Sequence, residues 1–191
     1  MNIEMTKLSG AAAILAALAA APAMAQEAGG WDADADGALS QAEFARGFAE
    51  RGIFDRWDQD RDGRLSETEF SGGVYGTYDR DRSGDLNETE YGRTEDRRGA
   101  SGFWGDNEAG YDYQAWDIDG DGVILSNEFA SGWGEEGMLG EWDVDRDGYL
   151  SEDEFSNGVF GEYDEDGTGI IEDPELTDIG DDMGDEGFWD V

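Results

Sequence analysis

Polar segments of twelve residues alternate along the chain with segments that carry most of its aromatic residues. The eighth residue of every polar segment is leucine or isoleucine, and an aromatic residue directly precedes the first. The connections are short, since Phe70 to Tyr78 contains only nine residues. Counting the ends of the polar segments, a helix of about 13 residues fits there and spans about 20 Å. The pattern predicts an all-α chain in which single helices are shared between consecutive polar loops.

The polar segments, here called loops 1 to 6, occupy residues 32–43, 58–69, 79–90, 117–128, 143–154 and 164–175. Loops 4 to 6 repeat loops 1 to 3 at a constant offset of 85 residues. A fixed offset of this kind indicates a duplicated structural unit. We therefore expect two tandem three-loop modules, residues 26–105 and residues 106–191, the second ending in an acidic C-terminal tail.

Each loop keeps the same register of residue types. Its first and third residues are aspartate, its fifth is aspartate, serine or threonine, and its twelfth is glutamate. Its sixth residue is always glycine, which reaches a positive φ without steric cost. A solvated acidic tract has no reason to keep these registers, so we interpret the loops as metal-binding.

This register resembles the calcium loop of the EF-hand superfamily. The resemblance implies side-chain ligands at loop positions 1, 3, 5 and 12 and a backbone carbonyl ligand at position 7. Position by position, these ligands fall on Asp32, Asp34, Asp36, Ala38 and Glu43; Asp58, Asp60, Asp62, Arg64 and Glu69; Asp79, Asp81, Ser83, Asp85 and Glu90; Asp117, Asp119, Asp121, Val123 and Glu128; Asp143, Asp145, Asp147, Tyr149 and Glu154; and Asp164, Asp166, Thr168, Ile170 and Glu175.

The resemblance is greatest to exported bacterial EF-hand proteins, and the short spacing between loops is similar to that of lanmodulin, a lanthanide binder. The proline that lanmodulin loops carry at position 2 is absent from all six loops, as is the aspartate that they favour at position 9. An additional carboxylate helps most with a trivalent ion. These departures favour Ca²⁺ over a trivalent lanthanide.

Residues 1–25 have the pattern of a secretory signal peptide. Lys7 precedes an apolar stretch from Ala11 to Ala21, and the segment ends in Ala23-Met24-Ala25. The apolar stretch is well short of the roughly 20 residues that span a bilayer core. We expect cleavage before Gln26 and a periplasmic or secreted protein without membrane insertion.

Composition narrows the possible partners. The net charge of −37 repels nucleic acid and anionic membranes, and the absence of histidine and cysteine disfavours zinc, copper and nickel. The partners that this composition favours are metal ions, and a protein partner remains possible. Because so high a charge opposes collapse, we expect metal binding to compact the chain.

These features predict a non-enzymatic calcium-binding protein that buffers or stores the ion, or uses it to stay folded. The alternatives are a lanthanide-binding protein and a calcium-dependent sensor that recruits a partner. Against the sensor, only Met138 and Met183 follow the signal peptide, too few for a methionine-rich groove. Against an enzyme, the regularly spaced carboxylates have metal roles and no nucleophile motif remains.

The length of the shared helix also predicts which loops pair. Loops at opposite ends of one straight helix cannot touch, so loops 2 and 3 are not expected to pair with each other. We expect loop 1 to pair with loop 3 inside a module, and loop 2 to meet loop 5 across the modules.

Overall fold

The computed structural model describes residues 30–91, 113–136 and 138–173, together with Glu175, Leu176, Ile179, Asp182 and Trp189. The expected signal peptide and the expected module boundary at residue 105 lie outside these residues. Within them, no helix is long and apolar enough to cross a membrane.

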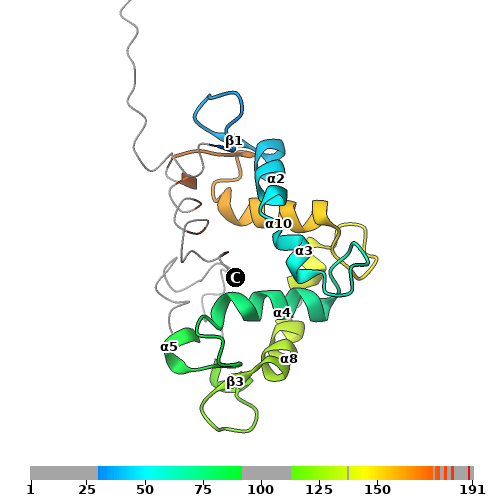
Figure 1. The fold of residues 1–191 in the computed structure, drawn as a ribbon, viewed down its shortest axis with the longest axis vertical. Helices are drawn as coiled ribbons and strands as arrows, with labels where there is room; N and C mark the ends of the chain where they lie inside the picture. Colours follow the sequence, from blue (N-terminus) through cyan, green and yellow to red (C-terminus); the bar gives the residue numbers. More distant parts are fainter. Residues whose placement is uncertain are drawn as a thin grey trace, which may run out of the picture.

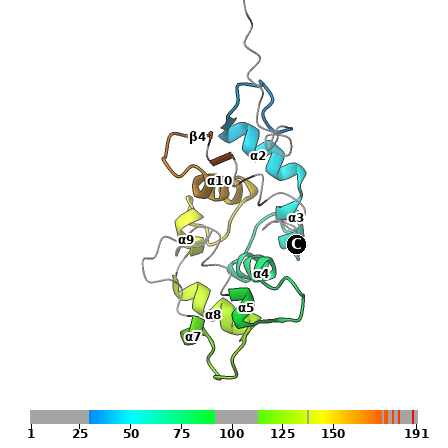
Figure 2. The same cartoon turned by 90° about the vertical axis from the view of Figure 1, so that its left-hand side faces the viewer.

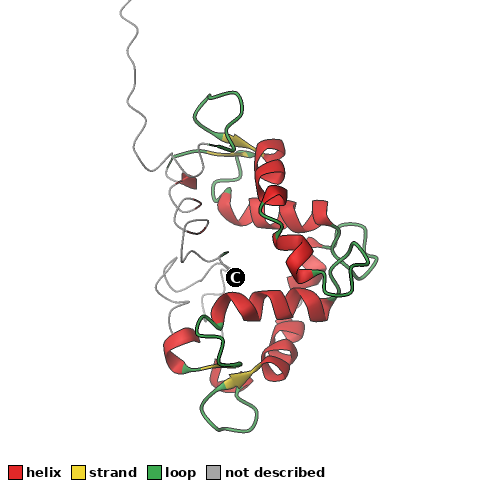
Figure 3. Cartoon of the chain, in the orientation of Figure 1, coloured by secondary structure: helices red, strands yellow, loops and turns green. Residues whose placement is uncertain are grey.

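The described part is mainly helical, as expected, with very short strands (Figure 3). The helices are α2 (Gln41–Glu50), α3 (Ile53–Trp57), α4 (Glu67–Tyr78), α5 (Glu88–Tyr91), α7 (Tyr113–Trp116), α8 (Ser126–Glu136), α9 (Met138–Trp142) and α10 (Glu152–Tyr163). The strands are β1 (Leu39–Ser40), β2 (Asp85–Leu86), β3 (Ile124–Leu125) and β4 (Ile170–Ile171). Helices α4 and α10 each run from the end of one loop to the start of the next, which confirms the shared helices.

Three of the helices begin with the same capping arrangement. Ser40, Ser66 and Ser151 are the N-caps of α2, α4 and α10, and each accepts a hydrogen bond from the backbone of the glutamate three residues later. The side chain of that glutamate in turn accepts a hydrogen bond from the backbone N–H of the serine, which completes a capping box. The last residue of the loop therefore also belongs to the first turn of the following helix and caps it.

Loops pair across the two repeats. Strand β1 of loop 1 pairs antiparallel with β4 of loop 6, and β2 of loop 3 pairs with β3 of loop 4. The expected pairing of loops 1 and 3 is therefore wrong, whereas the expected meeting of loops 2 and 5 is confirmed by an antiparallel bridge between Leu65 and Leu150. Helix packing accounts for these loop pairings, because α2 buries its aromatic face against α10 and α4 packs against α8 (Figures 1 and 2).

These pairings obey an approximate two-fold symmetry. Leu39 pairs with Ile171 in one sheet. The residues equivalent to them by the repeat offset of 85 are Ile124 and Leu86, and these pair in the other sheet. Leu65 and Leu150 exchange places under the same operation. Aromatic contacts obey the same symmetry. Phe44 stacks on Phe48 with their ring centroids 5.4 Å apart, and the equivalent residues Phe129 and Trp133 stack with their centroids 5.5 Å apart. The duplicated sequence thus folds as two intertwined repeats.

Aromatic side chains fill the core on both sides of this axis. Phe70 and Phe155 are equivalent residues of the two repeats, and their ring centroids lie 6.2 Å apart. Trp189, only 3% exposed, packs against Phe48, Trp57 and Phe155. The C-terminal end therefore packs back onto the core at Trp189.

Candidate metal centres

The six loops lie at the periphery of the helical core. In Figure 1, loop 1 lies at the upper end and loop 4 at the lower end, while loops 2 and 5 lie side by side where α3 and α4 meet.

Loop 2 shows how backbone N–H groups orient the carboxylates. Asp58 accepts the N–H of Gly63 at Oδ2 (2.9 Å) and that of Asp62 at Oδ1 (3.2 Å). At the other end of the loop, Glu69 accepts the N–H of Gln59 at Oε1 (3.0 Å) and that of Ser66 at Oε2 (3.0 Å). The same bonds from the sixth residue to the first hold in all six loops, so each chain segment curls around its own acidic side chains.

Two backbone positions in each loop lie in the left-handed region, and only one of them follows from the sequence argument. The sixth residue is glycine with φ between 83° and 92° in every loop. The fourth residue is also left-handed: Ala35, Arg61, Arg82, Gly120, Arg146 and Gly167, with φ between 55° and 72°. The glycines at this position in loops 4 and 6 were the available sequence signal.

The expected ligands converge in the first five loops. In each, three carboxylate residues offer oxygen atoms that all lie within 4.8 Å of one another. Loop 1 brings together its carboxylates at positions 1, 3 and 5, whereas loops 2 to 5 bring together those at positions 1, 3 and 12. The groups are Asp32, Asp34 and Asp36; Asp58, Asp60 and Glu69; Asp79, Asp81 and Glu90; Asp117, Asp119 and Glu128; and Asp143, Asp145 and Glu154.

Burial shows that these groups fit a cation. Five expected ligands are buried, namely Asp58, Glu90, Glu128, Asp143 and Glu175, with exposed fractions of 4–7%. Among the described residues none of them forms an ion pair with a basic side chain. Glu90 has in addition a buried oxygen, Oε1, without any hydrogen-bond partner. Burying an uncompensated carboxylate is costly, and an all-oxygen donor set suits a hard cation such as Ca²⁺.

Hydrogen bonds lower the pKa of three of the twelfth-position glutamates, Glu43, Glu69 and Glu154. The hydroxyl and backbone N–H of Ser40, with the N–H of Ala33, lower the pKa of Glu43 to about 2. Burial alone would raise the pKa of Glu69, but the hydrogen bonds from Ser66, Asp60 and Gln59 together outweigh it and the pKa is lowered. The pKa of Glu154 is lowered by the backbone and side chain of Ser151. These glutamates are thus prepared as charged ligands.

Repulsion and desolvation act in the opposite direction on two of the third-position aspartates, Asp34 and Asp60. The charge of Asp36 raises the pKa of Asp34, and burial raises that of Asp60. A cation placed among these carboxylates would relieve the repulsion.

Position 7 behaves differently from loop to loop. In loops 3 and 6 its carbonyl faces the fifth-position hydroxyl: Ser83 donates to the carbonyl of Asp85 (3.0 Å), and Thr168 donates to that of Ile170 (3.1 Å). In loop 2 the side chain of Arg64 adds a contact that the sequence did not predict, because its guanidinium reaches loop 5.

In four of the loops, the tryptophan that precedes the loop packs against the helix that follows it. Trp31, Trp57, Trp116 and Trp142 directly precede loops 1, 2, 4 and 5, and a glycine follows each of them sixteen residues later. A Cβ atom at Gly47, Gly73, Gly132 or Gly158 would overlap the indole ring of the corresponding tryptophan. The rings therefore lie directly on the backbone of the exit helix.

This geometry defines a protein with acidic, oxygen-lined loops for metal ions. A sequence model of the EF hand family matches residues 51–74 and 140–160, which contain loops 2 and 5 with all or part of the helices on either side. The two matches support the EF-hand superfamily and, with it, binding of a divalent metal ion, typically Ca²⁺. No curated protein matches the chain.

Proposed function

We propose that this protein is an exported, non-enzymatic calcium-binding protein that holds up to six ions and acts as a calcium buffer or store. The observation that carries the proposal is the set of buried carboxylates that converge in the loops without a basic partner among the residues that the structure describes. Export rests on the signal-peptide pattern of residues 1–25 and on the likeness to exported bacterial EF-hand proteins. Extracellular modules of this loop type bind at about 10⁻⁴ to 10⁻³ M, a range that suits an exported buffer.

Equilibrium dialysis of the mature chain against calcium tests the proposal. We expect uptake approaching six ions per chain, and the loss of about one ion on Glu69→Gln, because this change removes a carboxylate oxygen at position 12. Glu67→Gln is the matched control, since Glu67 is an exposed residue of the same helix and no expected ligand. The proposal fails if the wild-type chain takes up no calcium at millimolar concentration.

The tryptophan contacts favour a buffer over a sensor. A sensor exposes an apolar face when its helices separate on ion binding. Here four indole rings lie on the exit helices, so separation would remove Trp57 from Gly73 and Trp142 from Gly158. We expect no increase in the binding of a hydrophobic dye when calcium is added. Strong dye binding only with calcium would instead support the sensor.

Competition between calcium and a lanthanide, followed by tryptophan emission, tests which ion the loops prefer. We propose calcium because the loops lack the position-9 aspartate that a trivalent ion favours. Sub-nanomolar lanthanide binding with no response to millimolar calcium would reverse this preference.

A further inference from the structure

The two repeats meet most closely at the bridge between loops 2 and 5. Leu65 donates its N–H to the carbonyl of Leu150 (2.8 Å), and Leu150 donates to that of Leu65 (2.9 Å). Because 65 and 150 differ by the repeat offset of 85, the approximate two-fold axis passes through this bridge. Arg64 and Tyr149, which precede these leucines, are therefore equivalent positions of the two repeats that carry different side chains.

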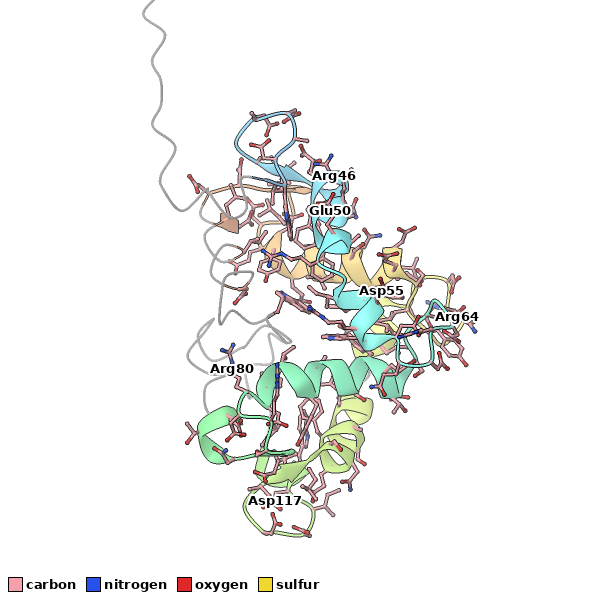
Figure 4. All side chains as sticks on the ribbon, in the orientation of Figure 1. Arg46, Glu50, Asp55, Arg64, Arg80 and Asp117 are labelled. Carbon is pink, nitrogen blue, oxygen red and sulfur yellow. The ribbon has the colours of Figure 1, made fainter. Side chains whose placement is uncertain are left out.

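These two side chains contact each other across the axis. The guanidinium carbon of Arg64 lies 4.2 Å from the ring centroid of Tyr149. Its Nη2 is 3.4 Å from Oδ2 of Asp62, and its Nη1 is 3.6 Å from Oδ2 of Asp147. Asp62 and Asp147 are themselves equivalent, so the arginine lies over a tyrosine and between two symmetry-related carboxylates. Figure 4 shows Arg64 at the right-hand edge of the molecule, where loops 2 and 5 meet.

The surroundings of this contact decide what it can do. The side chains of Arg64, Asp62 and Asp147 are 45%, 38% and 43% exposed, and ion pairs at such exposure add little to stability. An exposed cation over a tyrosine ring has a modest effect as well. A contact of this strength discriminates between pairings better than it holds a fold together.

We propose that Arg64 and Tyr149 form a heterotypic recognition contact that makes the first repeat pair with the second and not with a repeat of its own kind. Two first repeats would place two arginines face to face on the axis. Two second repeats would place two tyrosines there, with the carboxylates of Asp147 and its counterpart left without a cation. Both like pairings lose the cation–ring contact. Only the unlike pairing places one arginine over a tyrosine ring and between the two carboxylates of Asp62 and Asp147.

Net charge acts in the same direction over the whole repeat. Residues 26–105 carry nineteen acidic residues and ten arginines, a net charge of −9, whereas residues 106–191 carry twenty-nine acidic residues and Arg146, a net charge of −28. Two second repeats would repel each other most strongly, and the arginines of the first repeat reduce this repulsion in the unlike pair.

The four possible combinations can be made in the full chain: the wild type, Arg64→Tyr, Tyr149→Arg, and the double exchange. The readout is hydrogen exchange of the Leu65 and Leu150 amides at one calcium concentration, since both amides donate in the bridge. We expect exchange about threefold faster in Arg64→Tyr, from the lost cation–ring contact, and about tenfold faster in Tyr149→Arg, where like charges also face each other. The double exchange should return both rates to near the wild-type values, because the two-fold symmetry presents the same carboxylates to an arginine at position 149.

Amides of the β1–β4 and β2–β3 pairs serve as internal references and should keep their rates. Arg61→Gln is the matched control for Arg64→Gln, because both remove one charge from loop 2 and only Arg64 reaches loop 5. Should Tyr149→Arg fail to fold, the Arg64→Gln and Arg61→Gln comparison still decides. The proposal is overturned if the double exchange is as fast as the faster single variant, if the references accelerate equally, or if Arg61→Gln matches Arg64→Gln.

Discussion

At the scale of single residues, the glycines of the exit helices are of two kinds. The indole ring of Trp57 lies against Gly73 and occupies the place of a Cβ atom there. At the neighbouring Gly72, nothing lies within 4 Å of an added Cβ atom. We predict that Gly73→Ala destabilises the protein by about 2–4 kcal/mol, because overpacking forces the ring off the helix. Gly72→Ala should stabilise it by about 1 kcal/mol through helix propensity.

Denaturant unfolding of both variants in calcium measures these free energies. The pair is well matched, since the two glycines are adjacent in α4 and receive the same methyl group. Equal effects of the two substitutions would show that the indole does not depend on Gly73.

The capping boxes give a second residue-scale prediction, on pH. The pKa of Glu43 is lowered to about 2 from its ordinary 4.5, so its ionised form stabilises the folded state. This contribution is complete above about pH 4.5 and is lost as the pH falls through about 2. Ser40→Ala removes the largest cause of the lowered pKa and should raise it, while costing about 1 kcal/mol of stability.

Carbon NMR of the Glu43 carboxyl in chelator-treated protein follows this titration. Ser131→Ala, at an exposed serine inside α8, is the control and should leave the pKa of Glu43 unchanged. An ordinary pKa for Glu43 in the wild-type chain would contradict the prediction.

At the scale of elements, α4 and α10 each join two loops, and each contains a glycine with open space around it. Gly76 and Gly161 are equivalent positions, and nothing lies within 4 Å of a Cβ built on either. We predict that Gly76→Ala and Gly161→Ala each stabilise the protein by about 1 kcal/mol and act additively. Thermal unfolding of the single and double variants checks this, and a loss of stability would show that the helices need flexibility there.

The C-terminal end acts as an element through Trp189. Its indole N–H donates to the hydroxyl of Tyr163 (3.0 Å), and that hydroxyl donates to Oδ2 of Asp182 (2.9 Å). We predict a loss of about 3–5 kcal/mol for Trp189→Ala, because the ring fills the space between Phe48, Trp57 and Phe155. Trp189→Phe should lose clearly less in the same denaturant experiment. If both lose under 1 kcal/mol, the end of the chain does not contribute to the core.

The elements also show what the sequence could predict. The loops were predictable because their ligands and their sixth-position glycines lie within twelve consecutive residues. The meeting of loops 2 and 5 followed from the length of the shared helix, but the partners of loops 1 and 3 were not predictable, because position 8 is leucine or isoleucine in all six loops and any one of them fits any other. The sixteen-residue spacing from Trp57 to Gly73 was visible in the sequence, but its meaning depends on a ring lying over a helix backbone.

At the scale of the whole molecule, the two repeats depend on each other, since each of the three loop pairings described here joins one repeat to the other. We predict that residues 26–105 alone do not form the native core as a monomer, because α2 lacks α10 and α4 lacks α8. Mixing this fragment with residues 106–191 in calcium should restore the helical signal in circular dichroism. A fragment that is monomeric and fully helical alone would contradict the prediction.

The same interdependence changes how the charge asymmetry acts. From the sequence we expect the second repeat, with its net charge of −28, to be the more dependent on metal and salt. Since its loops pair with those of the first repeat, chelation of loops 4 to 6 should also loosen loops 1 to 3. Hydrogen exchange measured across both repeats during chelation would show whether they open together.

The bridge between Leu65 and Leu150 has a consequence for the origin of the chain. A shorter ancestor with one copy of the repeat could have closed this bridge only with a second molecule, as a symmetric homodimer. Duplication and fusion would then have placed both halves on one polypeptide. The two residues that face each other at the axis would no longer have had to be identical. Arg64 opposite Tyr149 is the kind of divergence that such a release permits.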